Sequence, residues 1–167
     1  MKRVYGRLAA MLAALFCLCG CGAKSTIQPI TDGFTAQATI RYKEMDVAGQ
    51  FSCSADGRVN MVFSQPKSLD GVTLGWNGSE MQMRLGGMTI TVAEDSMPDG
   101  GLIRCLTRVL AAVEPAGGKK EGERYVIDGA VGGTAYTLVC DGQTGFPQTL
   151  SVPDEQLEVT FSDVTVL

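Results

Sequence analysis

The chain has 167 residues, with 14 lysines and arginines against 18 aspartates and glutamates, so its net charge at pH 7 is −4. This length suits one domain with a hydrophobic core, and two domains would be crowded. The acidic balance argues against nucleic acid as a partner, because phosphates are bound by basic surfaces. The chain has no histidine, which removes the commonest general base and most zinc or haem ligation. Composition therefore favours a globular protein that is not an enzyme and holds no metal or cofactor.

The first 20 residues have the pattern of an export signal. Lys2, Arg3 and Arg7 precede an apolar run from Leu8 to Leu18. This run is too short for a membrane-spanning helix, which needs about 20 apolar residues. We therefore predict a signal peptide over residues 1–20. Its removal would take away three basic residues and no acidic one, so the mature chain would be more acidic still.

The residues that end this signal resemble the lipobox of bacterial lipoproteins. In Leu18-Cys19-Gly20-Cys21, one apolar and two small residues precede a cysteine, although serine, threonine or alanine is more usual than Cys19. The resemblance implies cleavage after Gly20 and attachment of diacylglycerol to Cys21. Two acyl chains give stable anchoring, since each buried CH₂ contributes about 0.8 kcal/mol. The alternative is an ordinary signal peptide with incidental cysteines.

Three segments follow from this pattern: the signal peptide (1–20), the lipidated cysteine with a polar tether (21–32), and one domain (33–167). The domain contains three cysteines, Cys53, Cys105 and Cys140. Their number is odd, their spacing does not fit a zinc site, and their surroundings are apolar. We predict buried free thiols, although export would permit a disulfide.

Alternation of apolar and polar residues predicts a series of antiparallel strands. From Phe34 to Tyr42 every second residue is apolar or aromatic, which is typical of a half-buried strand. The pairs Asp56-Gly57, Asn77-Gly78 and Gly86-Gly87 are typical of hairpin turns. Before the helix, the predicted strands lie within residues 34–42, 45–53, 59–63, 72–76, 81–85 and 88–92.

One segment, Asp99 to Pro115, changes to helical periodicity. Its apolar residues recur at spacings of three and four, which predicts an amphipathic helix with Asp99 as its N-cap and Pro115 at its end. The charged residues from Lys119 to Arg124 are expected to form an exposed connection. The later predicted strands lie within residues 125–127, 135–140, 148–152 and 157–162.

These elements predict a mainly β (α+β) fold. The helix must bury its apolar stripe and the sheet must bury one face, so we expect a curved antiparallel sheet or an unclosed β-barrel packed around the helix. A flat sandwich is the alternative. The strand residues expected to point inward are Phe34, Ile40, Phe51, Met61, Phe63, Leu74, Trp76, Met81, Met83, Ile90, Leu138 and Phe161.

Two further groups of residues invite a chemical interpretation. The carboxylates of Glu94, Asp95 and Asp99, and of Asp154 and Glu155, could serve a glycosidase, but their turn-like contexts favour solvated loops. Met81, Met83 and Met88 offer thioethers that suit copper(I). Met81 and Met83 lie on the apolar phase of a strand, so packing or a pliable apolar pocket explains them without metal.

The domain also resembles the LolA and LolB superfamily of lipoprotein carriers and receptors. The likeness covers about Phe34 to Val164 and rests on FTAQATIRY, FSQPKSLDGV before WNG, the helix after MPDGG, TAYTLVCDGQTGFPQTL and LEVTFSDV. It implies an unclosed antiparallel barrel plugged by helices, with an apolar cavity for acyl chains. The receptor, like this chain, carries a lipobox, whereas the carrier is not lipidated. None of the receptor's functional residues can be matched here.

Our first functional hypothesis is a membrane-anchored extracytoplasmic lipoprotein that binds a lipid, an acyl chain or another hydrophobic ligand, in lipoprotein sorting or envelope maintenance. The anchor would hold it on the plasma membrane, or on the outer membrane of a Gram-negative cell. The cavity candidates are Trp76, Met81, Met83, Phe63 and Leu106. The alternative is a non-catalytic module of the cell envelope that has a packed core and binds another protein.

Overall fold

The computed structural model describes residues 32–97 and 101–167. Within them, one α-helix, α2 (Leu102–Ala112), follows the first six strands and precedes the last five. The first six strands are β1 (Phe34–Tyr42), β2 (Met45–Cys53), β3 (Val59–Gln65), β4 (Thr73–Trp76), β5 (Glu80–Leu85) and β6 (Met88–Ala93). The last five are β7 (Lys119–Glu121), β8 (Arg124–Val131), β9 (Thr134–Asp141), β10 (Pro147–Val152) and β11 (Leu157–Val166).

Short 3₁₀ turns complete the secondary structure. They are η1 (Lys67–Leu69), η2 (Glu94–Ser96), η3 (Pro115–Gly117) and η4 (Pro153–Glu155). The predicted hairpin turns are present: Gly57 has φ +80°, and the Asn77 side-chain oxygen accepts hydrogen bonds from the backbone N–H groups of Ser79 (3.0 Å) and Glu80 (2.9 Å). Such turn chemistry fixes the register of the strands it joins.

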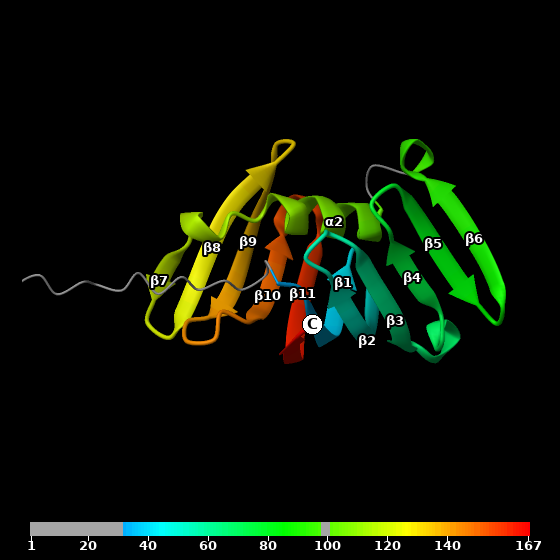
Figure 1. The fold of residues 1–167 in the computed structure, drawn as a ribbon, viewed down its shortest axis with the longest axis horizontal. Helices are drawn as coiled ribbons and strands as arrows, with labels where there is room; N and C mark the ends of the chain where they lie inside the picture. Colours follow the sequence, from blue (N-terminus) through cyan, green and yellow to red (C-terminus); the bar gives the residue numbers. More distant parts are fainter. Residues whose placement is uncertain (1–31, 98–100) are drawn as a thin grey trace, which may run out of the picture.

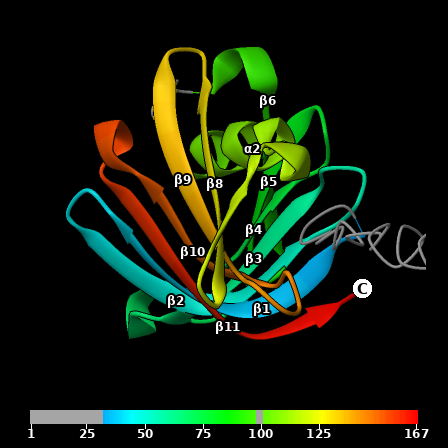
Figure 2. The same cartoon turned by 90° about the vertical axis from the view of Figure 1, so that its left-hand side faces the viewer.

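All strands belong to a single antiparallel sheet of eleven strands, in the order β6-β5-β4-β3-β2-β1-β11-β10-β9-β8-β7. The first and last long strands of the domain, β1 and β11, pair at its centre, and each half then continues outward as a meander. The two ends, β6 and β7, do not meet, so the sheet remains open (Figure 1). Seen from the side, the sheet curves into a trough with α2 in its mouth (Figure 2). The curved, unclosed sheet is therefore confirmed, and the flat sandwich is wrong.

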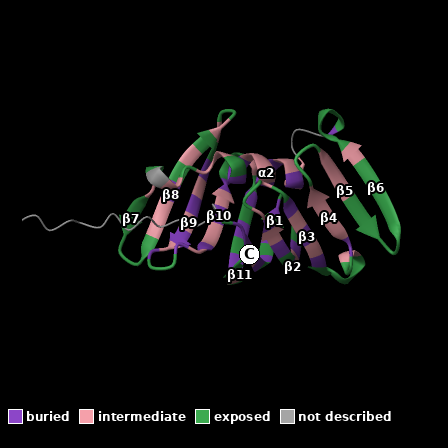
Figure 3. Cartoon of the chain, viewed as in Figure 1, coloured by how far each residue is buried: buried purple, intermediate pink, exposed green. Residues whose placement is uncertain are grey.

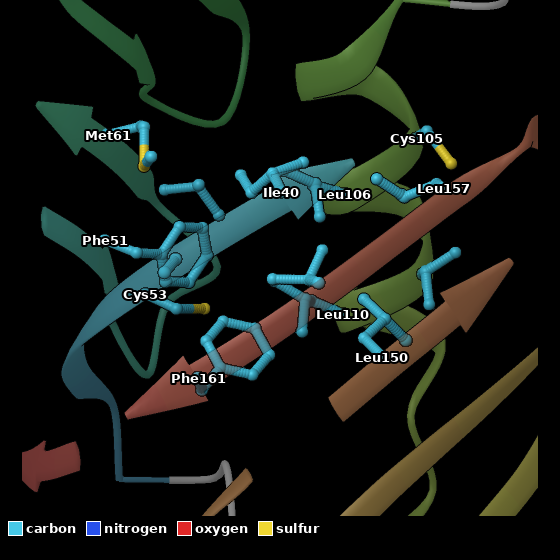
Figure 4. Packing of buried hydrophobic residues seen from close by; sticks show 14 of the residues in the cluster. Ile40, Phe51, Cys53, Met61, Cys105, Leu106, Leu110, Leu150, Leu157 and Phe161 are labelled. Atoms are coloured by element: carbon cyan, nitrogen blue, oxygen red, sulfur yellow. The ribbon is translucent and has the colours of Figure 1, made fainter. Parts of the chain in front are cut away.

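The core lies between the centre of the sheet and the helix. Phe34, Phe51 and Phe161 form an aromatic group, with ring centroids 5.5–5.7 Å apart. Leu106 and Leu110 of α2 are directed toward the sheet (Figure 4). Burial of such side chains contributes about 1.5–3 kcal/mol each, which makes this contact the main stabilising feature of the domain.

The predicted strands are confirmed, although several of their ends differ, as at β11, which continues beyond Ser162 to Val166. The charged segment predicted as a connection contains β7, whose three residues are all exposed. It was missed because an edge strand with neither face buried shows no apolar alternation. Strand β8 continues beyond Ile127 to Val131. The helix begins at Leu102 with Gly101 as its N-cap, so the prediction of Asp99 as N-cap is wrong; Asp99 itself lies outside the described residues.

Candidate functional site

The concave side of β4, β5 and β6 carries a continuous apolar surface, which we call the wing face. Strand register places Trp76 opposite Met81 and Leu74 opposite Met83. On β6, Val92 lies opposite Met81, Ile90 opposite Met83 and Met88 opposite Leu85. The wing face consists of Leu74, Trp76, Met81, Met83, Leu85, Met88, Ile90 and Val92. Its eight side chains include neither a charged nor an amide group.

Exposure of this surface increases from the core to the edge of the sheet. Met61 on β3 is 2% exposed and its β4 neighbour Leu74 is half-buried. The next residues outward in the same row, Met83 and Ile90, are 38% and 55% exposed. Nearer the Gly86-Gly87 turn, Leu85 and Met88 are 47% and 67% exposed. Figure 3 shows the corresponding change from buried β3 to exposed β6.

Among the residues that the structure describes, nothing covers the outer part of the wing face, because the helix is short. Eleven helical residues extend about 16 Å, whereas eleven strands at ordinary spacing extend about 48 Å across the sheet. Helix α2 reaches β4 on one side and β8 on the other. The outer strands β5 and β6 therefore present their apolar side beyond the end of the helix.

The boundary between helix and wing face is held by Arg104. Its guanidinium donates hydrogen bonds to the backbone carbonyls of Met97 (2.8 Å) and Glu94 (3.2 Å) in the segment that follows β6. Met97 is itself buried. These contacts fix the start of the helix against the end of the wing. Trp76, Met81 and Val92 are half-buried against the core.

The five predicted cavity residues fall into two groups. Phe63 and Leu106 belong to the packed core, where they are 6% and 1% exposed. Trp76 and Met81 are half-buried on the wing face beside the core, and Met83 is exposed on it. Cys21, the predicted lipidation site, lies outside the described residues. The structure therefore joins three of the five candidates on one surface and separates the other two from it.

Met83 and Ile90 were expected to point inward in a sheet packed around the helix, and they do point inward but are 38% and 55% exposed. Both lie on the concave face but beyond the reach of α2. Leu85 and Met88 were not proposed as site residues, although they complete the same surface. The available signal was the apolar phase that continues unchanged through the Gly86-Gly87 turn.

Two hollows adjoin these elements. One, of about 180 Å³, lies between the second half of α2 and the β2–β3 turn, and its walls include Cys53, Leu110 and Val113. The other, of about 220 Å³, lies on the convex side, where Gly75 leaves a gap between Asn60 and Gln82. Both are smaller than the roughly 300 Å³ expected of a ligand cavity. A third hollow, of about 490 Å³, is larger than that, but four of its seven lining residues are charged: it is lined by Tyr42, Lys43, Glu44, Met45, Asp154, Glu155 and Gln156. Among these features the wing face is therefore the apolar one open to a ligand.

The ionisable groups near the core do not form a reactive site. Cys53, Cys105 and Cys140 are free and buried, as predicted. Burial raises the pKa of the Cys53 and Cys105 thiols to about 11 and that of Cys140 to about 12, so all three are protonated at neutral pH. In the part of the chain that the structure describes, no group of three or more Cys, Asp or Glu side chains could hold a metal ion.

An open antiparallel half-barrel with one helix in its mouth is the architecture that the resemblance to the LolA and LolB superfamily implies, and the chain has it. The fold and site thus define an open antiparallel half-barrel with one helix in its mouth and an apolar surface on β4–β6.

Solved structures of similar fold include an uncharacterized conserved protein from Thermus thermophilus, at 12% identity and a TM-score of 0.51, with 83% of this chain and 80% of that chain covered. They also include a LolA superfamily protein from Nitrosomonas europaea, at 9% identity and a TM-score of 0.44, with 84% and 89% covered. A third is the Mycobacterium tuberculosis lipoprotein LppX, at 12% identity and a TM-score of 0.40, with 78% and 85% covered. No protein-family model and no curated protein matches this chain.

Proposed function

We propose that this chain is an extracytoplasmic lipoprotein, lipidated on Cys21, that binds an acyl chain, a lipid or another hydrophobic ligand on the wing face. The observation that carries the proposal is the uncovered apolar surface of β4–β6. Soluble monomers rarely expose a contiguous apolar surface of this kind, and where they do it marks an interaction site. No reaction is part of the proposal.

The side chains of the wing face suit a flexible ligand. Met81, Met83 and Met88 supply unbranched, polarizable side chains that adapt to irregular apolar shapes. Trp76 adds a large flat surface near the core. An extended chain that lies across β4–β6 would have one side on the sheet and its end against α2, which contacts β4.

The test uses cis-parinaric acid, a fluorescent fatty acid, with the purified full chain. Trp76 is the only tryptophan, so energy transfer from it to the probe reports binding near the wing face. Met83→Glu should weaken binding by about tenfold or more, a loss of about 1.4 kcal/mol. The matched control is Thr89→Glu, which places the same charge on the convex side of the neighbouring strand. Equal binding by both variants, or no energy transfer in the unmodified protein, would overturn the proposal.

A second candidate, a protein-interaction module of the cell envelope, is favoured by the packed interior. Phe63 and Leu106 leave little room between helix and sheet. Native mass spectrometry of the protein purified from a bacterial host separates the candidates. A co-purified lipid supports the ligand-binding function. A bound envelope protein without any lipid supports the protein-interaction module.

A further inference from the structure

The two open edges of the sheet differ in the features that protect an edge strand. Strand β7 has three residues, Lys119, Lys120 and Glu121, all charged and exposed. Short length and charge are the usual means of preventing one sheet from pairing with another. Strand β6 has six residues, Met88–Ala93, with the sequence MTITVA. It has no charge and no proline, and threonine, isoleucine and valine favour extended structure.

The backbone of β6 is ready to accept another strand. The N–H of Glu94, just after β6, donates to the carbonyl of Ser79 across the β5–β6 pair (3.1 Å). Because hydrogen-bonded positions alternate in an antiparallel pair, the N–H and C=O groups of Thr89 and Thr91 are directed away from β5. Within residues 32–97 and 101–167, no strand lies beyond them. Figure 1 shows β6 at the end of the sheet.

We propose that β6 is a homodimer interface, in which a second copy of this chain pairs its own β6 antiparallel across a two-fold axis at Ile90. The inference is independent of lipidation and of the proposed ligand. Thr89 then lies opposite Thr91 of the second copy, Met88 opposite its Val92, and Ile90 opposite its Ile90. Threonine side chains thus lie opposite threonine side chains, and apolar side chains lie opposite apolar side chains. Both kinds of cross-strand pair stabilise adjacent strands.

A second copy fits this edge for two reasons. Self-pairing brings no like charges together, since β6 carries none. It also joins two wing faces into one, so the exposed side chains of Met88 and Ile90 gain apolar neighbours. A partner strand of another protein would need the same alternation to do this. A six-residue pairing belongs to the small interface class, so the dimer forms reversibly.

Disulfide trapping tests the interface in cells that express the full chain. Copper phenanthroline with oxygen takes two electrons from two thiols, which form one S–S bond and release two protons. Ile90→Cys should give a covalent dimer, because directly opposed residues lie within disulfide reach. If the two-fold axis lies at Thr91, Thr91→Cys gives the dimer instead; this exposed convex residue tolerates the change. The wild-type cysteines in the described domain are buried and should not form cross-links between copies.

The matched control is Met45→Cys, which replaces another exposed methionine, 48% exposed, far from β6. Random collision would cross-link all three variants equally. A dimer from Ile90→Cys or Thr91→Cys well above the Met45→Cys level supports the interface and identifies its register. Sedimentation of the unmodified protein should show a concentration-dependent dimer that Thr91→Lys abolishes. Cross-linking no greater than that of the control, together with a purely monomeric protein, would overturn the proposal.

Discussion

Apolar residues on the concave face of the sheet differ mainly in how much of each side chain is covered by neighbouring residues. Phe51 and Met83 both occupy the concave face, but Phe51 is fully buried in the aromatic group whereas Met83 is 38% exposed. Their alternation in the sequence is the same, because it reports only which face of the strand a residue occupies. The cost of removing each side chain therefore depends on neighbours that the local sequence does not specify.

We expect Phe51→Ala to lower the free energy of unfolding by about 3–5 kcal/mol, because it leaves a cavity between Phe34 and Phe161. Met83→Ala should cost much less, about 1 kcal/mol, since its side chain is 38% exposed and leaves no enclosed cavity. Urea unfolding followed by circular dichroism measures both. A cost of several kcal/mol for Met83→Ala would mean that the wing face is covered in solution.

The buried thiols predict a decrease in stability at alkaline pH. Burial raises the pKa of Cys140 from its ordinary 9.0 to about 12, with a smaller effect from Asp141. Below pH 9 the thiol is neutral in both states, so this contribution to stability is fully present. As the pH rises from about 9 toward 12, the unfolded chain releases a proton that the folded chain keeps, and stability falls.

The measurement is the urea midpoint at about pH 8, 9 and 10, which spans the ordinary pKa of the thiol. Cys140→Ala is the control, because tyrosines and lysines also titrate in this range and only the thiol contribution is lost in the variant. The midpoint should fall less steeply with pH in Cys140→Ala than in the unmodified protein. Identical slopes would show that the Cys140 thiol does not contribute.

At the scale of elements, the helix is held at its C-terminal end by two tyrosines from the sheet. The Tyr136 hydroxyl donates to the carbonyl of Ala112 (2.8 Å), and the Tyr125 hydroxyl donates to that of Pro115 (2.7 Å). Gly129 leaves room for the Tyr136 ring, since a Cβ there would lie 2.4 Å from it. These bonds satisfy carbonyl groups in and after the last helical turn.

Tyr136→Phe should lower the free energy of unfolding by about 1–2 kcal/mol, because the Ala112 carbonyl loses its donor. Gly129→Ala should cost more, since the added methyl group collides with the ring. Chemical denaturation checks the order of the two variants. If Tyr136→Phe is neutral, water replaces the hydroxyl and the tyrosine does not hold the helix.

At the scale of the whole molecule, the attachment to a membrane is predicted to depend on Cys21 alone. No helix within the described residues is long and apolar enough to cross a bilayer. Cys21→Ser should move the protein from the membrane to the soluble fraction and abolish labelling by a radioactive fatty acid, because the acyl chains on this residue are the proposed anchor. Persistent labelling in that variant would contradict the lipobox assignment. Lys24→Ser, a change in the tether, is the control and should leave attachment intact.

The sequence by itself determined the order of the elements, the residues on each strand face, and the place of the one helix in the described domain. These follow from local periodicity and turn chemistry, as in β1 and the Asn77-Gly78 hairpin. It also predicted the free, buried thiols, whose apolar surroundings are visible in the chain. The weak edge strand β7 was missed because nothing local requires three charged residues to be extended.

Only the tertiary structure decided which part of the apolar face is covered. An eleven-residue helix cannot span an eleven-stranded sheet, so Phe63 and Leu106 are buried while Met83, Met88 and Ile90 are exposed. Coverage depends on the length of the helix, the strand on which it rests and the curvature of the sheet. These are long-range properties, because each depends on contacts between residues far apart in the chain, as in the pairing of β1 with β11.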